Sequence, residues 1–457
     1  MSGFYIENFG CRAARADGEA VSASLRSHGL AESSLPDADI VLINTCSVTA
    51  EADRDARAFV RKTRRANPSA KIVVTGCYAQ RAPEEIAALE GVTAVVGNSH
   101  KALLPALIPD LLRELTPSAS PLLPAASLLG QAAILADDRF AHSFLEEAPL
   151  APGAQTRPNL KIQEGCSNRC TFCVIPTTRG HSRSLQAEKV LHQIRTFVAA
   201  GGNELVLSGI NLGRWGRDIP NSPNFPALLR QILEETSLAR LRLSSIEPMD
   251  WTPELIALLR GFGPTGRIAR HAHLPLQSGS DAVLRRMHRR YRPWHYEQKV
   301  AALIEAIGPQ LALGADVMIG FPGETDTEFR ETHDLITRLP FTYLHLFPFS
   351  PRPGTPGWDL HRKSPVPAQA VRERMATLRT LIAEKTLAFR RSLIGAILPA
   401  ITLHTPPETA IQGRTLVLTD NFIQLEIDQP LPANHLITLQ LTDTNPAILS
   451  PLQNSSS

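Results

Sequence analysis

Short apolar runs alternate with amphipathic helical patterns through the first hundred residues of this chain. The runs with strand character cover residues 4–10, 38–45, 70–76 and 92–98, and helical patterns fill the intervals. Strands and helices that alternate in this way favour a parallel sheet with helices on both faces. We therefore predict that residues 1–105 form a three-layer α/β domain with a parallel sheet.

A second alternation begins near residue 157. It contains six strand-like runs, each followed by a helical pattern: 159–165, 203–209, 238–245, 271–278, 311–323 and 341–349. Six strands with helical crossovers predict a partial (βα)6 TIM-like barrel over residues 157–390, with its chemistry on the loops that follow the strands. The helical pattern at 367–394 closes this region.

Two further segments differ in composition. Residues 106–156 are rich in Pro, Ala, Ser and Leu, so we predict a linker there. Residues 391–450 contain patches of alternating apolar and polar residues, at 415–428 and 436–443, which predict a small β-barrel. We expect residues 451–457 to be a disordered tail.

The overall charge and the chain start limit the classes of partner. The formal charge is +3 and the isoelectric point about 8.6, a basic excess that permits nucleic-acid binding without requiring it. No segment is apolar enough to span a bilayer, and the start has no basic stretch followed by an apolar run. We therefore expect a cytoplasmic protein with no membrane partner, in which six cysteines serve as metal ligands or in catalysis rather than in disulfides.

Three of these cysteines follow predicted strands of the first domain. Cys11 comes after the first run, Cys46 after the second and Cys77 after the third. Because the carboxyl ends of parallel strands lie at one edge of a sheet, the three thiols are expected to converge there. The alternative is that each is a small buried apolar side chain, which is common for free cysteine.

The other three cysteines stand in one short loop, Cys166-x3-Cys170-x2-Cys173, after the first strand of the predicted barrel. A structural zinc site needs four protein ligands, and the spacing of bacterial ferredoxins carries a fourth cysteine nearby. Three thiolates on a cluster of four irons leave one iron open, and an open iron can bind a substrate or cofactor directly. The spacing thus favours a catalytic cluster.

This spacing, after the first strand of a predicted barrel, resembles that of the radical S-adenosylmethionine enzymes. The resemblance implies a [4Fe–4S] cluster on Cys166, Cys170 and Cys173 as the catalytic centre. Its open iron would chelate S-adenosylmethionine, which reduction splits to methionine and a 5′-deoxyadenosyl radical.

The order of the segments is similar to that of the methylthiotransferase family over most of the chain. The resemblance implies a second [4Fe–4S] cluster on Cys11, Cys46 and Cys77, whose free iron holds the inserted sulfur, and a carboxyl-terminal domain of the TRAM type. Two departures from the family are Ala14, where an asparagine is usual, and a carboxyl-terminal domain with few Lys and Arg residues.

Shorter motifs indicate the branch of the family. Residues 207–216, 242–248, 273–287 and 347–357 are most similar to enzymes that add a methylthio group to carbon 2 of N6-threonylcarbamoyladenosine beside the tRNA anticodon. The implied partners are the tRNA anticodon loop, S-adenosylmethionine and an electron donor such as flavodoxin or ferredoxin. The sequence leaves the oligomeric state open, with a monomer as the expectation. The alternatives are methylthiolation of isopentenyladenosine or of a ribosomal protein side chain, and a two-cluster electron-transfer protein.

Several residues at predicted strand ends are candidates for contact with S-adenosylmethionine: Gly209, Ser245, Glu247, Gln277 and Gly320, with Gly323 and Glu324 beside Gly320, and with Asp316 and Arg352 as weaker candidates. Each has a structural alternative, in which it closes a turn. The basic runs 53–65 and 285–292 are either phosphate contacts for tRNA or solvated helix faces. Tyr291 and Trp294 are candidates for stacking on a base.

Overall fold

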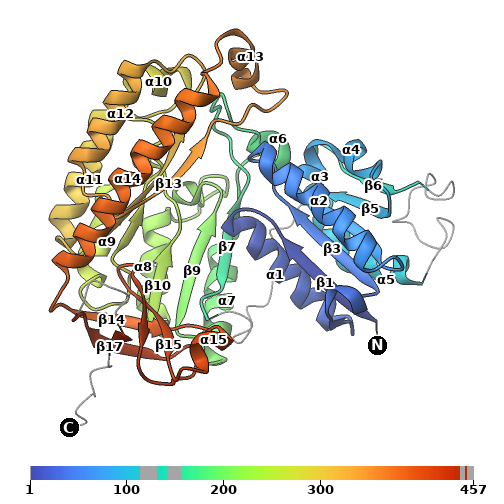
Figure 1. Ribbon diagram of the computed structural model, residues 1–457. Coiled ribbons are helices and arrows are strands. Elements are labelled where there is room, and N and C mark those ends of the chain that lie inside the picture. Colours follow the sequence, from blue (N-terminus) through green and yellow to red (C-terminus); the bar gives the residue numbers. More distant parts are fainter. Residues whose placement is uncertain (1, 114–130, 141–155, 443–447, 450–457) are drawn as a thin grey trace. The chain divides into compact units, whose positions relative to one another are not determined.

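The computed structural model describes residues 2–113, 131–140, 156–442 and 448–449 (Figure 1). The chain divides into two compact units. The first contains Met1–Leu150, Lys161–Leu185 and Ser350–Trp358, and the second contains Ala151–Leu160, Gln186–Phe349 and Asp359–Ser457. None of the helices in the described ranges has the length and apolarity needed to cross a membrane.

A six-stranded parallel sheet forms the centre of the first unit. Its strands lie in the order β2 (Ala31–Glu32), β1 (Gly3–Asn8), β3 (Ile40–Thr45), β4 (Lys71–Gly76), β5 (Val92–Gly97) and β6 (Ala133–Leu135). Helices α1 (Arg12–Ser27) and α5 (Leu104–Leu112) pack on one face, and α2 (Ala50–Ala66), α3 (Cys77–Arg81) and α4 (Pro83–Ala87) pack on the other. The predicted three-layer α/β arrangement is confirmed for this region.

The prediction of a linker over 106–156 is wrong in two places. Leu107, Ile108 and Leu111 are buried in the core beneath α5, and β6 adds a strand to the edge of the sheet. The composition did not indicate either element, because Pro109 lies inside α5 and β6 is short. Residues 114–130 and 141–155 lie outside the described residues.

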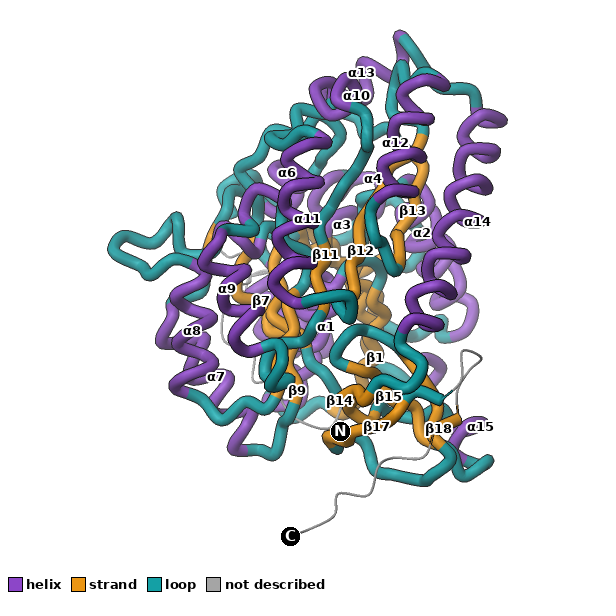
Figure 2. The backbone as a smooth tube through the Cα atoms, turned by 90° about the vertical axis from the view of Figure 1, so that its left-hand side faces the viewer, coloured by secondary structure: helices purple, strands orange, loops and turns teal. Residues whose placement is uncertain are grey.

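The second unit contains strands followed by helices. Strand β7 (Asn159–Glu164) begins in this unit, where the N–H of Val206 donates to Pro158. Strands β9 (Glu204–Gly209) and β10 (Arg240–Leu243) pair in parallel. Strands β11 (His271–His273), β12 (Ala312–Ile319) and β13 (Tyr343–Pro348) form a parallel group in that order (Figure 2). The connecting helices are α7 (Ala187–Ala199), α8 (Phe225–Glu235), α9 (Pro253–Phe262), α10 (Asp281–Arg286), α11 (Pro293–Ile307) and α12 (Asp326–Arg338).

The end of the second unit is an antiparallel sheet. The helix α14 (Ala368–Ser392), preceded by α13 (Pro356–Lys363), leads into β14 (Ile397–Thr402), α15 (Pro407–Ala410), β15 (Thr415–Thr419), β16 (Gln424–Ile427) and β17 (Leu436–Gln440). The order is β17-β14-β15-β16, with β18 (Ile448–Leu449) parallel to β16. The guanidinium of Arg242 donates to the carbonyls of Thr419 and Asp420, so this sheet is tied to β10 through buried hydrogen bonds.

Candidate metal centres

Cys46 and Cys77 follow strand residues that are register partners. Thr45 on β3 pairs with Gly76 on β4, and the two cysteines are the next residues along the chain. Gly76 has a φ of +99°, and a Cβ atom on it would lie 2.3 Å from the carbonyl oxygen of Thr45. The parallel register therefore delivers both cysteines to one edge of the sheet, and a glycine allows the backbones to approach there.

Cys11 reaches the same edge from the neighbouring strand β1. The N–H of Phe9 donates to β3 over 2.8 Å, so the strands stay paired up to the loop that carries Cys11. A Cβ atom on Gly10 would lie 2.8 Å from Sγ of Cys46, so this loop runs directly against Cys46. Cys46 and Cys77 are buried, whereas Cys11 is exposed.

The electrostatics of Cys46 reflect this convergence. Burial raises the pKa of its thiol to about 12, and repulsion from Cys77 and Cys11 contributes to the rise. Three neighbouring thiolates are therefore unfavourable at this edge unless a cationic group binds them, as iron does in a cluster.

Substitution of Gly76 by alanine tests how strictly this edge is built. Both the positive φ and the contact with Thr45 oppose a Cβ atom, so we expect Gly76→Ala to lower the free energy of unfolding by about 2–3 kcal/mol. Gly29→Ala is the matched control, because its φ is +84° but nothing lies within 4 Å of the added atom. It should cost about 1 kcal/mol in urea denaturation. Equal losses would contradict the steric argument.

The loop with Cys166, Cys170 and Cys173 is held by its own backbone. The N–H of Cys166 donates to the carbonyl of Gly180 over 3.0 Å, and the N–H of Cys173 donates to Cys170 over 3.1 Å. The N–H of Asn168 lies 3.4 Å from Sγ of Cys166, a contact that favours the thiolate. Cys166 is buried, and the other two thiols are partly exposed.

This loop belongs to the first compact unit, together with the other three cysteines. The sequence places it in the barrel region, so the structural boundary differs from the predicted one. A buried ionic cluster accounts for the difference. Asp17 on α1 binds Lys101 over 3.0 Å, Arg179 over 3.1 Å and also Lys161, and Glu164 binds Arg179 over 2.7 Å and also Lys161.

This cluster, formed by Asp17, Lys101, Lys161, Glu164 and Arg179, joins two carboxylates to three basic side chains. Burial lowers the pKa of Lys101 and so favours its neutral form, whereas Arg179 stays charged. Burial opposes the charged form of Arg179, but the negative charges of Cys77, Glu164, Asp17 and Cys11 hold its pKa well above the ordinary value. A buried cation needs an anionic partner. An anionic cluster held by the three thiolates fits that requirement.

The N–H donors of the Arg179 guanidinium are only partly used by protein groups. The helix α6 (Ile175–Arg179) packs against α3, which begins at Cys77. The side chain is 1% exposed, and its Nη1 atom binds Asp17 and Glu164. Its Nε and Nη2 atoms are buried with no hydrogen-bond partner among the described residues. Leaving such donors unsatisfied costs about 1–3 kcal/mol each.

Neither set of cysteines is arranged around a single ion. Among the described residues, the only group of three potential ligands whose atoms all lie within 4.8 Å of one another is His273, Asp316 and His345. Thiols that are more widely spaced suit a cluster, in which each thiolate binds a different iron. The donor sets therefore fit the two clusters that the resemblance implies.

Three candidate residues for S-adenosylmethionine contact are already engaged with protein groups. The hydroxyl of Ser245 lies 2.7 Å from Nδ1 of His273, and the carboxylate of Glu247 accepts from Arg289 over 2.5 Å. Gly320 donates its N–H to Glu324 over 2.9 Å.

Gly320 also has a steric explanation. It has a φ of +76°, and a Cβ atom on it would lie 2.5 Å from Val371 on α14. Glu324 is buried and binds Arg374 over 2.8 Å. Close packing of the helix against the strand end therefore explains this glycine, and the role of Gly320 in cofactor binding stays a prediction.

Gln277 and Gly209 remain available for a ligand. Gln277 has a φ of +62°, an unusual conformation for a residue with a side chain, and its backbone bridges to Val317 on β12. Its Oε1 atom is buried without a partner among the described residues. Gly209 is the last residue of β9 and is partly exposed. An unpaired acceptor four residues beyond β11 makes Gln277 the best supported of the five candidates.

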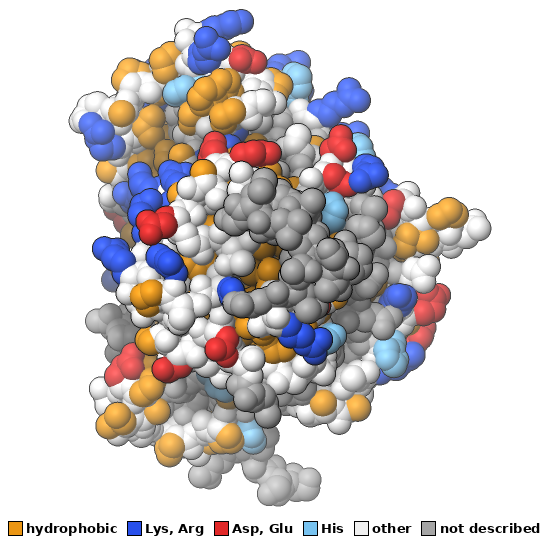
Figure 3. Space-filling view, turned by 90° about the vertical axis from the view of Figure 1, so that its right-hand side faces the viewer, with side chains coloured by type: hydrophobic (Ala, Val, Ile, Leu, Met, Phe, Trp, Pro, Cys, Tyr) orange, Lys and Arg blue, Asp and Glu red, His pale blue; other side chains and the backbone are white. Residues whose placement is uncertain are grey.

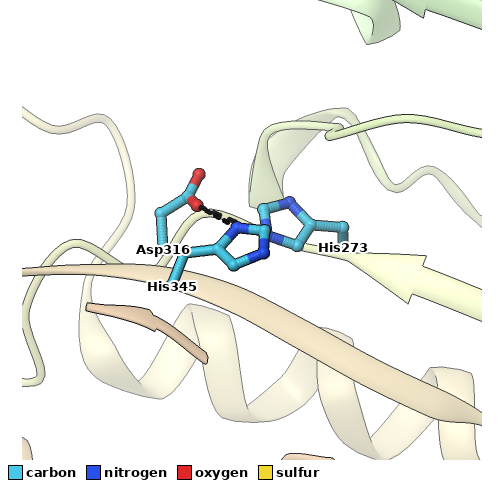
Figure 4. A group of neighbouring side chains, drawn as sticks. All are labelled: His273, Asp316 and His345. Carbon is cyan, nitrogen blue, oxygen red and sulfur yellow. Dashed lines mark hydrogen bonds and ion pairs between the residues drawn. The ribbon is translucent and has the colours of Figure 1, made fainter. Parts of the chain in front are cut away.

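Asp316 takes part in a cluster that the sequence analysis did not identify (Figure 4). His273, Asp316 and His345 come from β11, β12 and β13, which lie side by side. One carboxylate oxygen of Asp316 lies 3.5 Å from Nε2 of His273 and 3.1 Å from Nδ1 of His345. Although burial raises the pKa of Asp316, hydrogen bonds from the two histidines lower it overall. Asp316 lies 43 positions after His273 and 29 positions before His345, so no local sequence motif predicts the cluster.

The basic run 285–292 is mostly neutralised. Arg285 and Arg292 pair with Asp281, and Arg286 pairs with Glu328. Phosphate binding through this run is therefore not supported.

Base stacking by Tyr291 is contradicted. Its ring is 1% exposed, and its hydroxyl donates to the carbonyls of Pro275 and Leu276. Trp294 is 47% exposed and remains accessible. Arg352 is buried in the first unit, where Nη1 lies 2.5 Å from Asp53, so the structure gives it an ion-pairing role. The sequence could not show that the side chains of Tyr291 and Arg352 are buried.

Comparison with known proteins identifies the family. Residues 3–97 match the model described as the uncharacterized protein family UPF0004, and residues 160–336 match the radical SAM superfamily. The threonylcarbamoyladenosine tRNA methylthiotransferase MtaB of Aquifex aeolicus is 34% identical over 92% of this chain and 95% of its own length. The chain belongs to the radical S-adenosylmethionine methylthiotransferase family. The family implies S-adenosylmethionine and a [4Fe–4S] cluster as cofactors.

Other similar proteins include relatives of two kinds and a solved structure. MtaB of Bacillus subtilis is 36% identical over 85% of this chain and 82% of its own. The tRNA-2-methylthio-N(6)-dimethylallyladenosine synthase of Syntrophobacter fumaroxidans is 33% identical over 86% and 83%. The radical S-adenosylmethionine methyltransferase TsrM from Kitasatospora setae has a similar fold, with a TM-score of 0.58, 15% identity and coverage of 79% and 78%.

Proposed function

We propose that this methylthiotransferase adds a methylthio group to carbon 2 of N6-threonylcarbamoyladenosine beside the anticodon of tRNA. The observation that carries the proposal is the 34% identity with MtaB of Aquifex aeolicus over 95% of that protein. The dimethylallyladenosine synthase of Syntrophobacter fumaroxidans matches at 33% identity over 83% of its length, so isopentenyladenosine is the second candidate substrate.

The two sets of cysteines receive separate roles in this proposal. Cys166, Cys170 and Cys173 hold the cluster that binds S-adenosylmethionine, and Cys11, Cys46 and Cys77 hold a second [4Fe–4S] cluster. When bound, these groups supply the 5′-deoxyadenosyl radical for the unreactive C2–H bond and the sulfur that replaces hydrogen. The buried position of Cys166 and its N–H contact keep the thiolate from water.

In the second unit, we assign cofactor contacts to the strand ends. The unpaired Oε1 of Gln277 can accept a hydrogen bond from S-adenosylmethionine, and the partly exposed Gly209 lets a ligand approach the backbone. We assign Ser245, Glu247 and Gly320 to the walls of the same site. The strands would then form the partial (βα)6 TIM-like barrel of radical S-adenosylmethionine enzymes, a fold that the similarity to TsrM supports.

For tRNA, the exposed basic side chains of α2 are the best supported contacts. Arg61, Lys62 and Arg65 are exposed on this helix. On the face shown in Figure 3, Lys and Arg side chains lie among Asp and Glu side chains of the described residues. We assign a TRAM-like role to the carboxyl-terminal sheet, and we expect a cytoplasmic monomer that receives electrons from flavodoxin or ferredoxin.

Mass analysis of nucleosides from bulk tRNA tests the substrate. A strain that lacks this protein should lose 2-methylthio-N6-threonylcarbamoyladenosine completely and accumulate N6-threonylcarbamoyladenosine, because the cofactor chemistry has no side-chain substitute. The wild-type gene should restore the nucleoside, and the Cys170→Ala variant should not. Loss of the methylthio form of isopentenyladenosine instead would establish the second candidate. Unchanged nucleosides of both kinds would refute tRNA as the substrate.

A further inference from the structure

Arg179 presents one unused edge of its guanidinium in the part of the protein that holds Cys11 and Cys77. In the planar guanidinium fork, Nε–H and one N–H of Nη2 point in the same direction and suit a single acceptor or two adjacent ones. Nη1 is used by Asp17 and Glu164, whereas Nε and Nη2 are buried with no partner among the described residues. The side chain is 1% exposed, so water is not the obvious acceptor.

The backbone next to Arg179 is linked to Cys77 through Asn98. The side-chain amide of Asn98 donates to the carbonyl of Thr178 over 2.9 Å, and the same nitrogen lies 3.5 Å from Sγ of Cys77. Thr178 is the residue before Arg179 on α6, and α6 packs on the helix that begins with Cys77.

We propose that the Nε–Nη2 edge of Arg179 donates hydrogen bonds to an anionic sulfur at the site formed by Cys11, Cys46 and Cys77. The acceptor is either a sulfide of the cluster or a sulfur ligand on its open iron. The inference rests on the proposed second cluster. Arg179 is therefore a binding residue for the sulfur site, and the buried ionic cluster aims it, because Asp17 and Glu164 hold Nη1 from the other side.

The choice of residue type agrees with this role. A lysine at this position would keep the charge but present a single ammonium instead of a flat pair of donors. A donor to an anionic cluster stabilises the reduced form, which carries more negative charge, and so raises the reduction potential. The same donor tightens the binding of an anionic sulfur ligand.

The test uses full-length protein with Cys166, Cys170 and Cys173 changed to alanine, so that any cluster signal comes from the other site. In this background we compare Arg179→Met, Arg179→Lys and Lys101→Met by iron content, by reduction potential from electron paramagnetic resonance, and by affinity for sodium methanethiolate. Lys101 is the control, because it is buried in the same ionic cluster and binds Asp17, as Arg179 does.

We expect Arg179→Met to lower the ratio of reduced to oxidised cluster at least tenfold at a fixed potential, which is about 59 mV for one electron. If the acceptor is a sulfur ligand on the open iron, methanethiolate binding also weakens at least tenfold; if it is a cluster sulfide, only the potential falls. Arg179→Lys should lie between Arg179→Met and the parent, and Lys101→Met should change either quantity by less than threefold.

Two results would overturn the inference: equal changes in Arg179→Met and Lys101→Met, or an Arg179→Lys protein that keeps the parent potential and affinity. The second comparison decides the matter if Arg179→Met fails to hold iron. If the parent background itself contains no iron, the proposed second cluster fails instead, so the two failures are distinguishable.

Discussion

Replacement of Cys11, Cys46 and Cys77 together by alanine is expected to leave about half of the iron and sulfide of the reconstituted protein, and to abolish methylthiolation. The reason is that these three thiols lie together at one edge of the first sheet, whereas Cys166, Cys170 and Cys173 lie in a separate loop. Iron and sulfide quantification measures the first effect, and transfer to tRNA measures the second.

The reciprocal variant supplies the control. Alanine at Cys166, Cys170 and Cys173 should also leave about half of the iron, and the sixfold variant should bind almost none. The cleavage of S-adenosylmethionine should survive the amino-terminal changes and be lost with the loop changes. Full iron content after the amino-terminal changes would show that these three thiols hold no cluster.

Asp17→Asn is expected to lower the free energy of unfolding by about 3–5 kcal/mol, because it removes one partner of a buried ion cluster. Asp17 is 1% exposed and binds Lys101, Lys161 and Arg179. The amide leaves Lys161 and Arg179 with the carboxylate of Glu164, and it removes the carboxylate that pairs with Lys101. Urea denaturation of the full-length protein measures the loss.

Asp55→Asn is the matched control, since Asp55 is exposed on α2. It should change stability by less than about 0.5 kcal/mol. If Asp17→Asn lowered the free energy of unfolding by less than about 1 kcal/mol, the assigned role would be contradicted, because removal of one partner from a buried ion cluster is strongly destabilising.

The acid dependence of stability gives the same test a second readout. Burial raises the pKa of Asp17, but attraction from Lys101, Lys161 and Arg179 outweighs it and lowers the pKa below the ordinary value. A lowered pKa means that the stabilisation is present above the unfolded value of about 3.9 and is lost as the pH falls through the folded value. Asp17→Asn should remove this part of the acid sensitivity.

The periodic patterns were sufficient for four of the six strands in the sheet of the first unit, β1, β3, β4 and β5, but not for β2 and β6. Runs such as Ile40–Thr45 and Lys71–Gly76 are apolar, short and bounded by polar residues, and the structure contains strands at those places. The pattern failed at α5, where Pro105 and Pro109 interrupt the helical signal although Leu107 and Ile108 are buried. Burial against a sheet outweighs local propensity, and composition does not record it.

The two cysteine sets could be read from spacing, because thiols are few and their chemistry is specific. The sequence did not indicate that the loop with Cys166, Cys170 and Cys173 belongs to the first unit. The position of this loop beside the first sheet depends on contacts of Asp17 with Lys101 and Arg179. These two residues lie 84 and 162 positions from Asp17 in the chain. An ordinary count of charges cannot distinguish these buried side chains from exposed ones.

By itself, the sequence determined the α/β class, the two sets of cysteines and the family of chemistry, since each depends on local periodicity or on fixed spacing. Only the tertiary structure decided which charged side chains are buried. It paired Arg352 with Asp53, buried Tyr291, brought His273 to Asp316, and left one edge of Arg179 without a partner. The physical reason is that burial and ion pairing are set by contacts between distant residues, which local patterns do not encode.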